Sequence, residues 1–119
     1  MPVEAIPAYN TTPDRVQYHP QGRDNGYVLG IGDLRVYIAG DTEDIPEMRA
    51  LKDIDIAFLP MNLPYTMSIQ QAAAAVSAFG PGRVYPYHYK GSDTAAFATL
   101  VGESGAATEV VLHDWYAGS

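Results

Sequence analysis

The chain has no cysteine, which excludes disulfides, cysteine-type zinc sites and thiol nucleophiles and leaves the redox compartment open. Basic residues are few, because seven Lys and Arg stand against fourteen Asp and Glu and give a net charge of −7. This charge repels nucleic acids and anionic membrane surfaces, so we expect neither as a partner. No apolar run is long enough to span a bilayer, and the first residues hold neither a basic segment nor a signal-peptide core. We therefore expect a cytoplasmic protein.

The composition is that of a globular protein. Of 119 residues, 47% are apolar and 18% are charged. A chain of this length forms one domain, residues 1–119, and buries roughly two-thirds of its unfolded surface. A strand-like run begins almost at the first residue, as it would in a segment cut from a longer protein.

The hydrophobic pattern predicts strands that alternate with helices. Residues 3–6 read as a strand ended by Pro7, and the Pro-, Asn- and Gly-rich stretch 9–25 reads as an irregular loop. Two β-like runs, 27–31 and 34–39, are joined by a Gly-Asp pair and predict a hairpin. The later elements are a short helix over 46–51, a strand over 54–59, a helix over 68–79 with a Ser68–Gln71 capping box, a strand over 84–86, a helix capped by Asp93 and a strand over 108–112. This order predicts an α/β fold with a mixed β-sheet and helices on at least one face.

Two of these strands end in a side chain that can bind a metal. Asp41 follows the strand over 34–39, and His88 follows the strand over 84–86. Open α/β sheets carry their chemistry at strand ends, where a rigid scaffold meets a solvated loop. We expect the two side chains to face each other and to form half of a metal site.

The same segments resemble a known family. The runs Tyr-Ile-Ala-Gly-Asp-Thr-Glu at 37–43, Asp-Ile-Ala-Phe-Leu-Pro at 55–60 and Tyr-Pro-Tyr-His-Tyr at 85–89 are similar, in order and spacing, to the C-terminal half of the metallo-β-lactamase superfamily. The branch they resemble is that of metal-dependent hydrolases related to the ascorbate-lactonate hydrolases. The resemblance implies half of a four-layer αββα sandwich, with a mixed sheet and helices on one face. It also implies that Asp41 is the ligand that bridges two metals and that His88 is the last histidine ligand.

One defining motif of that family is absent. The chain has no His-x-His-x-Asp-His segment, and its histidines are His19, His88 and His113. Zinc takes three or four protein ligands. The chain offers Asp41 and His88, with His19 as a third ligand if its loop folds back. We therefore expect an isolated chain to be a poor metalloenzyme.

Other roles for these residues are open at this point. Asp41 could cap a helix or tighten a turn, and His88 could pack against its neighbouring tyrosines. His19 could be a surface histidine, and His113 lies where the family has no ligand. Asn62, Tyr65 and Tyr87 are candidate substrate-binding residues, although a tyrosine suits an interface equally well and a loop asparagine can face solvent.

Half a sandwich would leave an apolar sheet face uncovered, and such a face marks an interaction surface. A homodimer or an N-terminal-half partner would cover it. In one hypothesis, Asp41 and His88 then hold zinc or another divalent metal, with or without His19, and the metal activates water against an ester, lactone, amide or phosphodiester. In the alternative, the chain is a metal-free, non-catalytic truncated half-domain that dimerises or binds a partner.

Overall fold

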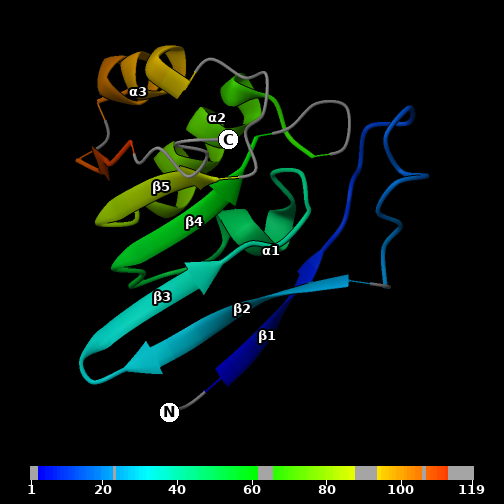
Figure 1. Ribbon diagram of the computed structural model, residues 1–119, viewed down its shortest axis with the longest axis horizontal. Helices are drawn as coiled ribbons and strands as arrows, with labels where there is room; N and C mark the ends of the chain where they lie inside the picture. The colour runs from blue at the N-terminus through cyan, green and yellow to red at the C-terminus, as the bar shows by residue number, and fades with distance from the viewer. Residues whose placement is uncertain (1–2, 23, 62–65, 88–93, 106, 113–119) are drawn as a thin grey trace, which may run out of the picture.

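The computed structural model describes residues 3–22, 24–61, 66–87, 94–105 and 107–112 (Figure 1). In chain order the elements are β1 (Val3–Ala8), β2 (Asp24–Ile31), β3 (Leu34–Ile38), α1 (Pro46–Arg49), β4 (Ile56–Pro60), α2 (Ile69–Phe79), β5 (Arg83–Tyr87), α3 (Thr94–Glu103) and β6 (Glu109–Val110). None of the helices in these described residues has the length and apolarity that a bilayer crossing requires.

The six strands form one mixed sheet in the order β1-β2-β3-β4-β5-β6, which confirms the predicted sheet type. Strand β2 pairs antiparallel with both β1 and β3, whereas each neighbouring pair from β3 to β6 is parallel (Figure 1). Two consequences position the site. The parallel strands β3, β4 and β5 end at the same edge of the sheet, and the start of the antiparallel β2 lies beside the end of β3.

Several element boundaries differ from the prediction. Strand β1 continues through Pro7, which an outer strand of the sheet tolerates because its missing N–H need not join a ladder. Strand β2 begins at Asp24 rather than at residue 27, because its first residues pair with the extended end of β1. Helix α1 ends at Arg49, two residues before the predicted 51, and β6 keeps two residues of the predicted 108–112.

Helix α2 has the boundaries that the sequence signals. Ser68 is its N-cap, and the side chain of Ser68 accepts a hydrogen bond from the backbone of Gln71 while the Gln71 side chain accepts one from the backbone of Ser68. This is the predicted capping box. Gly80 ends the helix with φ of 56°, in the left-handed region that glycine adopts most easily.

One face of the sheet packs against the helices. Tyr37 in β3 and Ala57 in β4 are neighbours in register, point to this face and are fully buried. The ring of Tyr37 meets the ring of Phe79 in α2 edge to face, with centroids 6.0 Å apart. Buried residues of all three helices join the same core, including Met48 of α1 and Phe97 of α3. Side chains alternate along β3, so Tyr37 lies on this face and Leu34 on the other.

The other face, which we call the open face, carries apolar residues that no described helix covers. By strand register its larger apolar and aromatic residues are Val3, Tyr27, Leu29, Ile31, Leu34, Val36, Ile38, Ile56, Phe58, Tyr85 and Tyr87. Val3, Tyr27, Ile31 and Leu34 are between 43% and 56% exposed. The continuous apolar run of β4 is typical of a strand covered on both faces, yet the described residues cover it on one.

Candidate functional site

Asp41 lies just beyond β3, in a turn that depends on Gly40. The φ of Gly40 is +73°, and a Cβ at this position would come within 3.0 Å of the Asn25 carbonyl oxygen. Glycine is therefore favoured here both by its backbone conformation and by the close approach of β2. The N–H of Gly40 donates to the Tyr87 hydroxyl at 3.1 Å, which joins the end of β3 to the end of β5.

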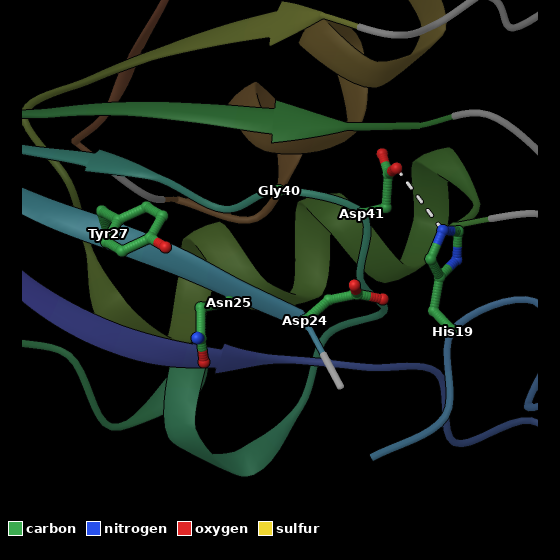
Figure 2. A pocket seen from close by; sticks show the side chains of 6 residues that line it. All are labelled: His19, Asp24, Asn25, Tyr27, Gly40 and Asp41. Atoms are coloured by element: carbon green, nitrogen blue, oxygen red, sulfur yellow. Dashed lines mark ion pairs between the residues drawn. The ribbon is translucent and has the colours of Figure 1, made fainter. Parts of the chain in front are cut away.

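His19 reaches Asp41 because the loop after β1 folds back. The backbone N–H of Asn10 donates to the carbonyl of His19 at 2.8 Å, so the two ends of the loop meet. His19 Nε2 lies 3.4 Å from Asp41 Oδ2, and Figure 2 shows the two side chains directed toward each other. The loop thus folds back as a ligand role for His19 would require, and the role itself stays a prediction. Asp41 does not cap α1, whose N-cap is Ile45 and has no side-chain cap bond.

A pocket of about 540 Å³ opens beside this pair. Its lining residues come from the loop after β1, the start of β2 and the turn after β3: His19, Asp24, Asn25, Tyr27, Gly40 and Asp41 (Figure 2). Sequence reasoning missed the three residues of β2. The signal was present in the hairpin, because antiparallel pairing brings the start of β2 beside the end of β3. The lining thus includes the carboxylates of Asp24 and Asp41, and their negative charge attracts a cation.

Tyr87 lies next to the pair, on the open face, although it is not among the six residues that line the pocket. Burial raises the pKa of Tyr87 to about 12, against the lowering effect of the Gly40 hydrogen bond and with a further rise from the charge of Asp41. The hydroxyl is therefore neutral at physiological pH. Its role in substrate binding stays a prediction.

The donor pair suits a metal in type and spacing. A tetrahedral site with bonds of about 2.0–2.1 Å separates its ligand atoms by roughly 3.3 Å, and His19 Nε2 and Asp41 Oδ2 are 3.4 Å apart. The number of donors is too small, however. Within the ranges that the structure describes, no three His, Asp or Glu side chains gather closely enough to hold a metal ion. Four residues named in the sequence analysis lie outside the described residues: Asn62, Tyr65, His88 and His113. The predictions made for them are therefore not tested by the structure.

A second feature that sequence reasoning missed is the burial of Glu43, two residues after Asp41. Its side chain is fully buried. Burial by itself would raise the pKa of Glu43, but hydrogen bonds from Thr12, Gln71 and Thr11 outweigh it and hold the pKa below the ordinary value of 4.5. Glu43 is therefore ionised at neutral pH.

The sequence and the fold both match known proteins. Residues 1–89 match the family described as the beta-lactamase superfamily domain. A UPF0173 metal-dependent hydrolase from Pyrococcus horikoshii is 32% identical over 116 residues, which cover 90% of this chain and 49% of that protein.

Two solved structures show the same architecture. A protein from Parabacteroides distasonis, named as a candidate metal-dependent hydrolase, is 55% identical with a TM-score of 0.89 over 94% of this chain and 50% of that one. The metallo-beta-lactamase fold protein YhfI from Bacillus subtilis is 10% identical with a TM-score of 0.71, over 93% of this chain and 46% of that one, and indicates the fold alone. The chain therefore spans about half the length of the relatives it matches.

Proposed function

This chain belongs to the beta-lactamase superfamily, and we propose that it is half of a metal-dependent hydrolase whose metal site is completed by a second protein surface. One observation carries the proposal: His19 Nε2 and Asp41 Oδ2 lie 3.4 Å apart in a pocket that also holds Asp24. Relatives of this chain are named metal-dependent hydrolases, which supports the same reaction class.

In this proposal Asp41 and His19 are two of the protein ligands, and His88 is the next. Zinc or another divalent ion, once bound, would lower the pKa of a coordinated water and polarise the bond to be hydrolysed. The imidazole of His19 would bind the ion through Nε2, while its Nδ1 faces the side-chain amide of Asn10 at 3.5 Å. Asp24 adds a second negative charge to the pocket, which favours capture of the cation.

Substrate binding falls to polar groups around the pair. The neutral hydroxyl of Tyr87 lies beside Gly40 and can orient a carbonyl or phosphoryl oxygen. Asn62 and Tyr65 stay candidates for the same role. The reaction class is hydrolysis of an ester, lactone, amide or phosphodiester.

The missing ligands would come from whatever covers the open face. The rings of Phe58 and Tyr85 stack on this face with centroids 5.1 Å apart, and the ring of Tyr87 meets Phe58 at 6.4 Å. The apolar surface thus runs up to the turn that carries Asp41, so a protein docked on it would reach the metal ligands. The relatives contain about as much chain again, which is of the size needed to cover the face. A second copy of this chain or a separate N-terminal-half partner would serve.

Elemental analysis after chelation and readdition of zinc, combined with the native mass, tests the proposal. We expect stoichiometric zinc in an assembled species, and its loss in Asp41→Ala, His19→Ala and His88→Ala. His113→Ala is the matched control, because it removes a histidine that is not a proposed ligand, and it should retain zinc. An assembled species that binds no zinc at any of these steps would refute the metal site.

The alternative is a metal-free module that dimerises or binds a partner through the open face. It is favoured by the number of donors, since the described residues bring two metal-competent side chains together and not three. A folded dimer whose mass is unchanged by chelation, and which contains no zinc, would support this function instead.

A further inference from the structure

The buried carboxylate of Glu43 is bound to the loop that delivers His19. Its Oε1 accepts hydrogen bonds from the backbone N–H groups of Thr11 at 2.8 Å and Thr12 at 2.7 Å. Its Oε2 accepts from the Thr12 hydroxyl at 2.6 Å, from the Arg15 guanidinium at 3.0 Å and from the Gln71 side-chain amide. One side chain therefore fastens the loop both to the segment after β3 and to the start of α2.

The same loop is fastened at its ends. The Thr42 hydroxyl accepts from the Tyr9 N–H at 3.0 Å, and the N–H of Glu43 donates to the Tyr9 carbonyl at 3.0 Å. Asn10, which is buried, donates from its backbone to the His19 carbonyl and from its side chain to the Arg15 carbonyl at 3.0 Å. Asp41 and His19 thus sit on two segments that the bonds of Thr42, Glu43 and Asn10 hold together.

We infer that Glu43 is a positioning residue, which sets the imidazole of His19 against the carboxylate of Asp41. The described part of the loop between β1 and β2 (residues 9–22) contains no helix or strand to fix its path, so contacts with the rest of the protein must do so. Without the carboxylate, the N–H groups of Thr11 and Thr12 would lose their partner in a part-buried place, which favours a different loop path. A role of Glu43 in catalysis rests on the proposed function, whereas its role in setting the path of the loop does not.

The test uses NMR of the 119-residue chain without added metal. Glu43→Gln keeps the size of the side chain but turns an amide N–H₂ toward groups that are themselves donors. We expect the His19 ring resonances to shift, the contact between the His19 ring and the Asn10 amide to weaken, and amide exchange at Thr11 and Thr12 to rise at least tenfold. Exchange at Tyr37, in the centre of the sheet, should stay as in the wild type.

Exchanging the two partners provides a rescue. In Glu43→Gln/Gln71→Glu the carboxylate moves to α2, where it can accept from Arg15 and from the Ser68 N–H, as the Gln71 carbonyl oxygen does in the wild type. Glutamate also suits the capping-box position. The double variant should restore the wild-type His19 resonances, which general destabilisation would not allow.

A matched pair of milder variants keeps the test decisive if Glu43→Gln does not fold. Thr12→Val removes the 2.6 Å hydroxyl bond to Glu43, and Thr108→Val removes a 2.6 Å hydroxyl bond to the Pro81 carbonyl, away from the loop. The first should move the His19 ring resonances and the second should not. Unchanged resonances in Thr12→Val, equal shifts in both variants, or a folded double variant without rescue would each overturn the inference. If the wild-type chain binds no zinc although the NMR responses are as expected, the proposed function alone is overturned.

Discussion

If the open face is where two copies of the chain meet, polar substitution on it should separate them. We take the double variant Ile31→Lys/Leu34→Glu. The two residues are opposite each other at the β2–β3 turn, so the new Lys and Glu form an attractive cross-strand pair and the hairpin is retained. The variant therefore removes apolar surface from the face without removing the strand pairing.

The magnitude follows from the exposure of these side chains. Ile31 is 49% exposed and Leu34 is 46% exposed. Full burial of such a side chain is worth about 1.5–3 kcal/mol, so burial of the exposed half is worth roughly 0.7–1.5 kcal/mol each. A two-fold interface counts both residues twice, which gives about 3–6 kcal/mol, or roughly two to four orders of magnitude in the dissociation constant. Because association itself costs at least about 4 kcal/mol, this loss decides whether a dimer forms at micromolar concentration.

Sedimentation velocity over a concentration series measures the effect. The wild type should sediment as a dimer and the double variant as a monomer with an unchanged circular dichroism spectrum. Val16→Lys is the control, because Val16 is 38% exposed but belongs to the loop after β1 and not to the strands that form the open face. A monomeric wild type, or equal dissociation in the control and the double variant, would contradict self-association through this face.

Two further predictions concern stability. Burial raises the pKa of Tyr9 and of Tyr87 from 10.0 to about 12, so both contribute stability that is complete below pH 10 and lost as the pH rises toward 12. Urea unfolding at pH 9 and pH 11 should show this fall, and Tyr9→Phe should reduce it; equal falls in variant and wild type would remove Tyr9 from the explanation. Gly26→Ala should destabilise by about 1–3 kcal/mol, because its Cβ would lie 2.4 Å from a backbone oxygen at the end of β3. In the matched variant Gly102→Ala of α3 the new Cβ meets nothing within 4 Å, and the substitution should stabilise the protein. An equal fall in melting temperature in the two variants would argue against the clash.

Local pattern was sufficient for most of the fold. The Gly-Asp pair at the β2–β3 turn and the capping box of Ser68 and Gln71 are signals between residues close in sequence, and each appears in the structure as predicted. The position of Asp41 at a strand end was readable for the same reason. The predicted strand boundaries were wrong where pairing between distant segments lengthens both strands, as the pairing of Pro7 with Asn25 does for β1 and β2.

The candidate site was half readable. Asp41 stands out because a strand delivers it, whereas Asp24 was overlooked because the strand that carries it was predicted to start later. His19 could be considered but not placed, since its position depends on the path of an irregular loop. Nothing local marks Glu43 as buried, because its partner Thr12 is 31 residues away along the chain.

The sequence by itself therefore determined the order of strands and helices, the mixed sheet and the presence of an acid at the end of β3. These follow from periodicity and turn chemistry, which act over a few residues. Tertiary structure alone decided that His19 meets Asp41 and that the buried carboxylate of Glu43 holds the loop that carries His19. Those features depend on where the chain returns after long excursions, and no short-range pattern encodes that.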